Sequence, residues 1–471
     1  MRSFALLLLA LVPTIAIARP LEALHGDPIA PVILGVTGIL SFAVLGRFAA
    51  RKLNLPSVLG ELVIGVVLGN LAYIYGIDLI VILREGPAIF DIVEHVLVGT
   101  PVDEAAVSVL GAKSAPSVLT ILQGPMGAQL VQVAHTVDVF SRYGVIFLLF
   151  LVGLETSVQE MRRVGGEAVR VAVVGVILPF ALGLAVVHML MPELPFNTGM
   201  FIAATLGATS IGISSRVLKD MHRERSPEAR IILGAAVIDD VLGLLMLAIV
   251  SGIVVRGGVA YLDVASIIVL ALLFLGSTFY LGPLVLRFIV RLLRHLDVVE
   301  AKMFVAYLFV MMLAWVANLV GLSTIIGAFA AGLILHDSYF DELEGHKARQ
   351  LTIKDMVMPL EVILVPIFFV LMGIQVKLEL FFHWDVILLA IGLLVAAIAG
   401  KVACGLVVRG EVNKLAIGFG MMPRGEVGLI FAAIGKSLGV INDELFSAVV
   451  MMVIITTLAA PLLLKLTLQR E

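Results

Sequence analysis

The chain has 471 residues, of which 61% are hydrophobic and 14% are charged, and its formal net charge is −3. Soluble domains carry about 25% charged residues, so this composition predicts an all-α polytopic membrane protein with little room for a soluble domain. The charge gives no reason to expect a nucleic-acid partner, and a single cysteine excludes a disulfide framework or a thiolate metal cluster. No cofactor is expected.

The first apolar run, residues 4–18, is typical of a secretory signal peptide. Arg2 precedes it, and Ala16-Ile17-Ala18 has the small-x-small form of a signal-peptidase site. We therefore expect residues 1–18 to be cleaved, the alternative being an uncleaved first helix. In either case the polar stretch that follows lies on the outer side of the membrane.

Thirteen apolar runs follow, and each is bounded by charged residues, glycine or proline. They predict transmembrane helices at about residues 31–48, 56–76, 140–158, 169–190, 198–218, 229–254, 264–288, 303–320, 323–335, 356–376, 386–408, 415–436 and 444–464. With the N-terminus outside and the C-terminus cytoplasmic, most Lys and Arg residues fall in loops on the cytoplasmic side, as the positive-inside rule requires.

The acidic stretch 77–138 tests this count of helices. Residues 117–137 are long enough to be mistaken for a span, and counting them would reverse the charge asymmetry of everything downstream. We therefore interpret 77–138 as an outer-face insertion whose amphipathic helices lie on the surface.

Two pairs of segments reveal an internal repeat. Residues 55–65 (LPSVLGELVIG) resemble residues 322–332 (LSTIIGAFAAG), and residues 150–155 (FLVGLE) resemble residues 370–375 (VLMGIQ). Under the topology above, the second member of each pair crosses the membrane in the opposite direction. The sequence thus predicts a first repeat at 31–254, a linker helix at 264–288 and a second, inverted repeat at 303–464. Inverted repeats are characteristic of secondary transporters.

Ionisable residues inside the expected spans are the next signal. Asp239 and Asp240 lie about ten residues into the sixth helix, and Lys401 lies in the eleventh. An unpaired charge at mid-helix costs roughly 2.5 to 3.5 kcal/mol, so such residues imply a use. Adjacent helical positions are about 100° apart. One carboxylate can therefore face Lys401 while the other faces a pathway, and two acids against one base leave a titratable site.

The fifth and twelfth helices, which are equivalent in the two repeats, contain helix-breaking segments. Residues 207–212 read GATSIG and residues 420–428 read GMMPRGEVG, with Pro423 in the second. Unwound backbone at membrane depth is tolerated only where it lines a cavity or meets other protein. The sequence therefore predicts two crossed discontinuous helices around an ion site at the membrane midplane.

Arg424 and Glu426 lie in the second break. A guanidinium stays charged at working pH and suits exposed carbonyls or a carboxylate, so we expect Arg424 and Glu426 to stabilise the broken helix rather than bind the ion. Glu61, near the cytoplasmic start of the second helix, is a candidate partner for Arg424.

At these residues the sequence resembles the cation:proton antiporter-2 family, the bacterial sodium/proton antiporters whose electrogenic members share an Asp-Asp pair. The resemblance extends from Pro31 onward and rests on an ordered set of short motifs: residues 59–61 with Gly65 and Gly69, 209–212, 239–240, 366–373, 400–401 and 422–427. The insertion at 77–138 has no counterpart that we can place.

The resemblance implies a sodium/hydrogen exchanger membrane domain at 31–464 and a homodimer in the bacterial inner membrane. Helices 4–6 and 11–13 would form a moving core and the others a dimerisation domain. It further implies that Asp240 binds the transported cation or proton and that Asp239 pairs with Lys401. Oxygen ligands from Asp240 and the opened backbone near Thr209, with Ser210 or water, suit Na⁺ or Li⁺.

We therefore expect a secondary transporter that exchanges Na⁺ or Li⁺ for protons by elevator-like alternating access, and no enzymatic activity. A potassium/proton antiporter is the first alternative. An intramembrane aspartyl protease is a different class, but it needs its two carboxylates on separate helices facing one water. A cation channel would need neither the Asp-Asp-Lys set nor the paired breaks.

Overall fold

The computed structural model describes residues 27–469 except 28, 54, 156–164, 224–225, 257–260, 294 and 341–350. The expected signal peptide at 1–18 lies outside these residues. Within the described ranges every regular element is a helix. Ten of these helices are long and apolar enough to cross a membrane: α2 (Ala30–Lys52), α3 (Ser57–Ile74), α7 (Gly127–Glu155), α9 (Gly166–Leu190), α12 (Pro227–Arg256), α13 (Tyr261–Leu292), α14 (Val298–Leu319), α17 (Ile353–Ile374), α18 (Trp384–Leu406) and α21 (Asp443–Leu468).

The remaining three expected spans are short or interrupted. The ninth is α15 (Thr324–Ile334), which has 11 residues. The fifth divides into α10 (Phe196–Thr205) and α11 (Ile211–Asp220), and the twelfth into α19 (Lys414–Gly420) and α20 (Glu426–Ser437). The breaks, residues 206–210 and 421–425, overlap the two glycine-containing segments that the sequence singled out. Each of the thirteen expected segments is therefore helical, while the number of complete membrane crossings stays a prediction.

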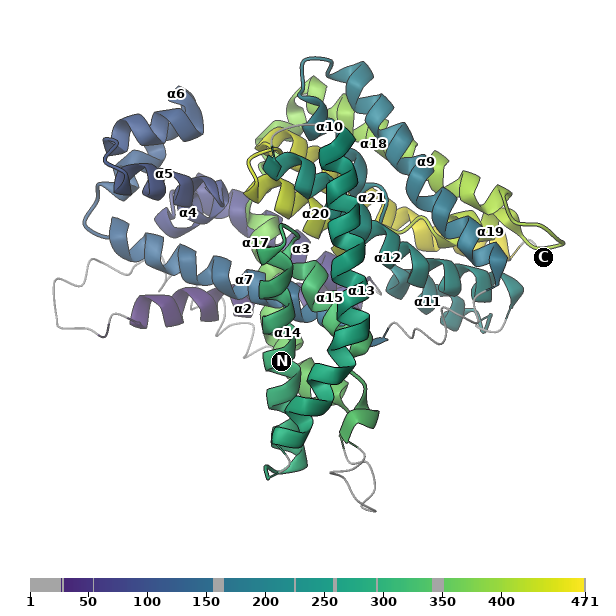
Figure 1. The fold of residues 1–471 in the computed structure, drawn as a ribbon. Helices are drawn as coiled ribbons and strands as arrows, with labels where there is room; N and C mark the ends of the chain where they lie inside the picture. The colour runs from purple at the N-terminus through teal and green to yellow at the C-terminus, as the bar shows by residue number, and fades with distance from the viewer. Residues whose placement is uncertain are drawn as a thin grey trace. The chain divides into compact units, whose positions relative to one another are not determined.

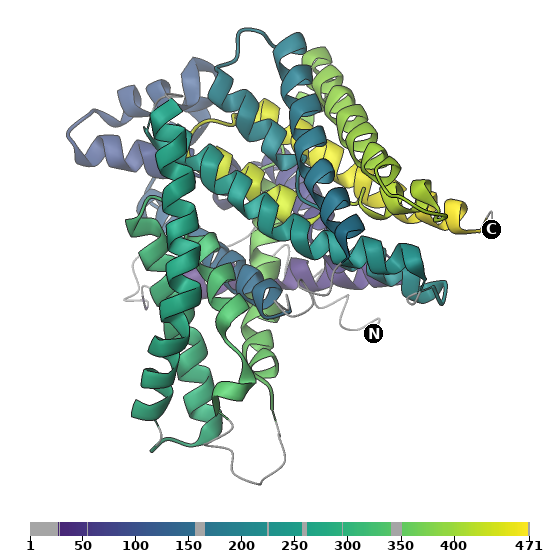
Figure 2. The ribbon, with the colours of Figure 1, turned by 45° about the vertical axis from the view of Figure 1, so that its right-hand side comes forward.

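The chain divides into two compact units (Figure 1). One contains residues 1–142 and 366–378, and the other contains residues 143–365 and 379–471. Two long helices, α7 and α17, contribute one part to each unit. The half-helices α10, α11, α19 and α20 all belong to the second unit, as do α9, α12, α18 and α21. Figures 1 and 2 show α9 and α18 packed along one another in this unit.

Close helix crossings recur at equivalent positions of the two predicted repeats. In the first unit Gly65 of α3 lies against the Val370 carbonyl of α17, and in the second unit Gly332 of α15 lies against the Phe150 carbonyl of α7. Gly65 corresponds to Gly332 in the repeat, and Val370 corresponds to Phe150. Glycine is required at both crossings because a Cβ would strike the facing backbone.

The neighbouring crossings follow the same rule. Gly46 of α2 meets Gly60 of α3, while Leu313 of α14 meets Gly327 of α15. The spacing of 267 residues that aligns residue 60 with residue 327 also aligns residue 46 with residue 313. Matched contacts of this kind support the inverted repeat that the sequence predicted.

These crossings give a stability prediction. Gly332→Ala should lower the free energy of unfolding by about 1–3 kcal/mol, because its Cβ would collide with rigid backbone of α7. Gly276→Ala in α13 is the matched control, since a Cβ there meets nothing within 4 Å and alanine favours helix. Thermal unfolding in detergent measures both. Equal melting temperatures for the two variants would show that the two helices can move apart enough to accommodate the added methyl group.

The insertion differs from its prediction in two respects. Its last expected residues form the start of α7, which begins at Gly127 rather than near residue 140, and residues 117–137 are divided between α6 (Val102–Leu122) and α7. In addition, α4 (Asp78–Glu85) is not a surface helix, because its residues 80–85 are buried. Only α5 (Ala88–Leu97) and α6 remain candidates for the expected surface helices.

Buried polar partners explain the position of α4. Arg84 donates to Asn70 Oδ1 of α3 at 2.8 Å, and Glu85 accepts from Lys377 at 2.8 Å. Asn70 also donates to the Val376 carbonyl and accepts from the backbone N–H of Leu378. We expected this segment to lie on the surface, but the partner of Glu85 is 292 residues away and the partner of Arg84 is 14 residues away on another helix.

Candidate functional site: a buried carboxylate at two crossed helix breaks

The two helix breaks meet, and each hydrogen-bonds to the other. The backbone N–H of Ser210 donates to the Pro423 carbonyl at 2.9 Å, and the Thr209 hydroxyl donates to the Met421 carbonyl at 3.2 Å. The Ser214 hydroxyl donates to the carbonyl of Gly420. Backbone groups that an uninterrupted helix would satisfy internally are thus satisfied across the crossing.

Arg424, which lies in the second break, hydrogen-bonds to the backbone of the first break. Its guanidinium donates from Nη1 to the carbonyls of Gly207 and Ala208, and its own carbonyl accepts from the Thr457 hydroxyl of α21. Thr209 and Arg424 occupy equivalent places, two residues before the start of α11 and of α20 respectively. Each therefore directs its side chain at the opened backbone of the other repeat.

The expected partner of Arg424 is different in the structure. Glu61, 1% exposed, belongs to the first unit and accepts from Arg47 Nε at 2.7 Å. Arg47 of the neighbouring helix α2 supplies this buried carboxylate with a guanidinium. The guanidinium of Arg424 instead donates to backbone carbonyls, the second kind of partner that we expected for it.

The adjacent carboxylates of α12 face different surroundings. Asp239 is fully buried and its Oδ1 lies 2.8 Å from the Lys401 ammonium of α18, which is also fully buried. Gly175 of α9 makes room for this ammonium, since a Cβ there would lie 3.3 Å from it. The ion pair expected across the two repeats is therefore present.

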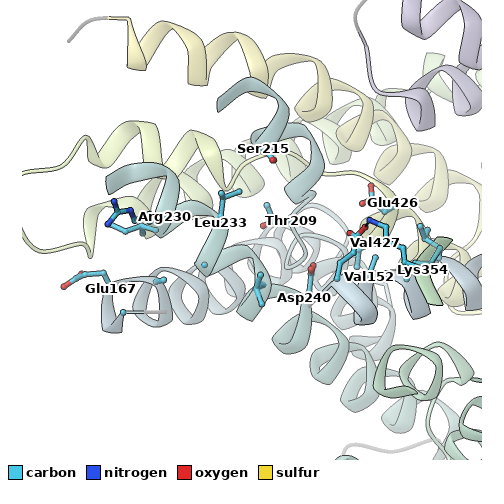
Figure 3. A pocket seen from close by; sticks show the side chains of 18 of the residues that line it. Val152, Glu167, Thr209, Ser215, Arg230, Leu233, Asp240, Lys354, Glu426 and Val427 are labelled. Carbon is cyan, nitrogen blue, oxygen red and sulfur yellow. Dashed lines mark ion pairs between the residues drawn. The ribbon is translucent and has the colours of Figure 1, made fainter. Parts of the chain in front are cut away.

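Asp240 instead lines a cavity of about 1030 Å³ in the second unit (Figure 3). Thr209 and Glu426 line the same cavity. In the view of Figure 3, Glu167 and Arg230 lie at one end and Lys354 and Glu426 at the other, with Asp240 between them. Asp240 is 8% exposed, whereas cavity-lining Lys354 is 51% exposed, so the cavity leads from the surface to a buried carboxylate.

Glu426 is placed differently from its expected role. It begins α20, lines the cavity and accepts from the Ser210 hydroxyl at 3.1 Å. Asp240 lines the same cavity. Glu426 is therefore a third carboxylate at the site and not only a support of the broken helix. Pro423 is buried in the break, where its carbonyl takes part in the crossing.

Several polar atoms at the centre of the site have no hydrogen-bond partner among the described residues. They are Asp239 Oδ2 and the Nε and Nη2 atoms of Arg424. Asp239 and Arg424 interact electrostatically. Buried polar atoms of this kind are the ones that ordered water or a bound ion satisfies.

Sequence reasoning missed a set of charged residues at the cavity. Glu361 lies inside the expected span 356–376, so the argument that selected Asp239 applied to it equally. Glu155 and Lys354 gave no such signal, because charges at helix ends are ordinary where a helix leaves a membrane. Only the packing of the helix ends brings them to one cavity.

Comparison with known proteins places the chain among cation antiporters. The family model described as "Sodium/hydrogen exchanger, transmembrane" matches residues 110–470. The chain is 35% identical over 443 residues to the "High-affinity Na(+)/H(+) antiporter NhaS3" of Synechocystis sp., covering 92% of this chain and 89% of the relative. It is 30% identical to the "Na(+)/H(+)-K(+) antiporter GerN" of Bacillus cereus, covering 74% of this chain and 88% of the relative.

A solved structure shows a similar fold. The sodium proton antiporter MjNhaP1 of Methanocaldococcus jannaschii superposes with a TM-score of 0.58, covering 94% of this chain and 99% of that chain. The sequences are 16% identical, so this likeness concerns the arrangement of the helices.

Proposed function

This chain belongs to the sodium/hydrogen exchanger family, and we propose that it exchanges Na⁺ for protons at Asp240. It is a multi-pass membrane protein that transports cations and protons, and it is not an enzyme. The single observation that carries the proposal is the position of Asp240. This carboxylate lines a cavity that reaches the surface, and it lies beside the crossed breaks, while its neighbour Asp239 is paired with Lys401.

The oxygen atoms around Asp240 suit a small hard cation. Thr209 lines the same cavity, and Ser210 joins it through the hydrogen bond to Glu426. Carboxylate, hydroxyl and backbone carbonyl oxygens are the ligands that such cations prefer. We assign Asp240, Thr209 and Ser210 as cation ligands, with Glu426 as a further carboxylate, and Na⁺ or Li⁺ as the cation.

The charges of the site support binding of either one proton or one monovalent cation at a time. Asp239 with Lys401, and Arg424 with Glu426, sum to zero, so the charge of Asp240 is left over. Either a proton or a monovalent cation at Asp240 makes the cluster neutral. Because a net charge is expensive within a membrane, the loaded site crosses more readily than the empty one. Proton and cation then compete for one carboxylate, and exchange is obligatory.

We further propose that the exchange uses alternating access of elevator type in a homodimer. The helices expected to move, α9–α12 and α18–α21, all lie in the second unit. The cavity is lined by Glu155, Glu167, Arg230 and Lys354, which lie at helix ends that the topology assigns to the cytoplasm. With the N-terminus outside, the structure then corresponds to an inward-open state in the bacterial inner membrane.

The Asp239–Lys401 pair is proposed to govern how many protons accompany each cation. While the two groups remain paired, only Asp240 exchanges a proton. When the pair opens, Asp239 can accept a proton or Lys401 can release one. A second proton then moves with each cation, and transport becomes electrogenic.

Potassium/proton exchange is the second candidate, and one relative favours it, because its printed name includes K⁺ as well as Na⁺. The size of the oxygen cage selects between the ions, and the residues present contribute ligands acceptable to either.

Reconstituted liposomes with a preset pH gradient test the proposal. Added Na⁺ should release protons in a saturable manner, Li⁺ should substitute for it, and K⁺ should do so weakly. Proton release driven by K⁺ alone would select the second candidate. Cation current without proton movement, or no cation-dependent proton release at all, would contradict antiport.

A further inference from the structure

Lys354 places a tethered ammonium at the mouth of the Asp240 cavity. It lies in the first turn of α17, and its Nζ is 2.5 Å from Glu155 Oε1 at the end of α7. Both residues line the cavity, and their side chains are 51% and 57% exposed. The ion pair is thus in contact with solvent on one side and with the cavity on the other.

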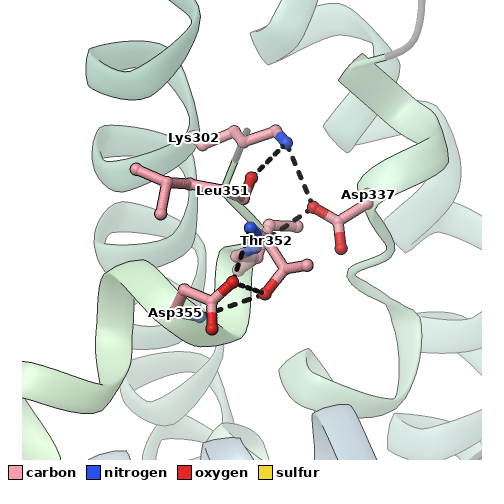
Figure 4. A network of polar contacts seen from close by, with 6 residues as sticks. Lys302, Asp337, Leu351, Thr352 and Asp355 are labelled. Carbon is pink, nitrogen blue, oxygen red and sulfur yellow. Dashed lines mark hydrogen bonds and ion pairs between the residues drawn. The ribbon is translucent and has the colours of Figure 1, made fainter. Parts of the chain in front are cut away.

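The backbone that carries Lys354 is fixed by its neighbours in the sequence (Figure 4). The buried Lys302 of α14 donates to the Leu351 carbonyl at 2.9 Å and lies 3.2 Å from Asp337, which in turn accepts from the Ile353 N–H. This network holds the residues just before Lys354.

A capping box holds the other side. Thr352 and Asp355 hydrogen-bond reciprocally, each side chain accepting from the backbone N–H of the other. Residues 351, 352, 353 and 355 are therefore all anchored. The attachment point of Lys354 is fixed, while its long side chain is free to exchange partners by bond rotation.

The cavity is lined by more carboxylates than basic groups. An ammonium group therefore balances part of the excess negative charge. The acidic residues of the cavity are Glu155, Glu167, Asp240, Glu361 and Glu426, and its basic residues are Arg230 and Lys354. Glu361 lies two helical turns beyond Lys354 on α17, and its charge acts on the same ammonium. The ammonium has the charge of the transported ion and binds the same kind of ligand.

We propose that Lys354 is a built-in competitor of the transported cation at the mouth of the cavity. It sets the cation concentration at which transport is half-saturated. While Lys354 pairs with Glu155, it neutralises the carboxylate that an entering cation would meet first, and the cation must displace it. This inference depends on the proposed function, because it concerns the entry of the exchanged cation to Asp240.

The test uses the full chain in liposomes and measures the half-saturating Na⁺ concentration and the maximal rate of proton release. Lys354→Gln removes the charge and keeps a polar side chain that is one atom shorter. At low ionic strength it should lower the half-saturating concentration about two- to fivefold, the effect of one exposed ion pair, with little change in maximal rate. Lys354→Arg, which keeps the charge, should retain the wild-type value.

Two controls isolate the charge at this place. Lys414→Gln removes an exposed lysine outside the cavity, at the start of α19 on the same predicted side, and should leave the half-saturating concentration unchanged. Glu155→Gln should raise that concentration. Because the effect is electrostatic and exposed, an inert salt that shortens the Debye length should shrink the difference between Lys354→Gln and the wild type.

The inference is overturned if Lys354→Gln leaves half-saturation unchanged or raises it, or if Lys414→Gln produces the same shift. It is also overturned if the shift persists at high inert salt. A wild-type protein that releases no protons on addition of any monovalent cation would refute the proposed function instead. The two failures are therefore distinguishable in one set of measurements.

Discussion

Asp240→Asn should abolish cation-dependent proton release while leaving the protein folded. The amide keeps the shape of the carboxylate but loses the negative charge that attracts a cation and the site that accepts a proton. Asp240 lines the cavity with an exposed fraction of only 8%, so the change removes the charge at the buried position where the cation is proposed to bind. We expect a loss of at least about a hundredfold in rate, typical for removal of a positioned proton-transfer group.

Two measurements separate loss of binding from loss of fold. Thermal unfolding of the wild type should shift upward with added Na⁺, because a ligand that binds only the folded state stabilises it, and the Asp240→Asn variant should show no such shift. Asp385→Asn makes the same chemical change at an exposed position on α18 and should retain both exchange and the Na⁺-dependent shift. Sodium-dependent proton release by Asp240→Asn would remove this carboxylate from the mechanism.

Arg424→Ala should lower both thermal stability and transport. The guanidinium is fully buried and donates to the Gly207 and Ala208 carbonyls, which open in the first helix break. Its removal strands those acceptors and leaves the negative charge of Asp239 with one nearby cation fewer. Loss of a buried charged partner costs about 3–5 kcal/mol, which is a large part of the stability of a typical domain.

The control for this variant is Arg142→Ala. Arg142 pairs with Asp138 on one helix and its side chain is 57% exposed, so its loss should change the melting temperature little. Because Glu61 pairs with Arg47, adding Glu61→Gln should not restore the stability of Arg424→Ala. An Arg424→Ala protein with wild-type stability and only a shifted cation affinity would place Arg424 in the ion path instead.

Local chemistry accounts for the part of the site that sequence reasoning recovered. A paired Asp239-Asp240 in an apolar helix is conspicuous, because a buried charge is expensive wherever the helix packs. A 100° rotation between adjacent residues separates their environments in any helix, which is why one meets Lys401 and the other the cavity. The breaks at 206–210 and 421–425 were likewise visible from glycine and proline alone.

The sequence by itself determined the membrane class, the helical segments, the repeat and the buried charges, because apolar length, helix-breaking residues and charge are properties of short segments. Only the tertiary structure decided which charge meets which. In the structure Glu61 pairs with Arg47, and Arg424 donates to backbone carbonyls. Helix α4 is buried by its contacts with Asn70 and Lys377, and Lys354 pairs with Glu155. The physical reason is that ion pairs and hydrogen bonds act over about 3 Å, whereas the partners are set by helix packing between segments that lie tens to hundreds of residues apart.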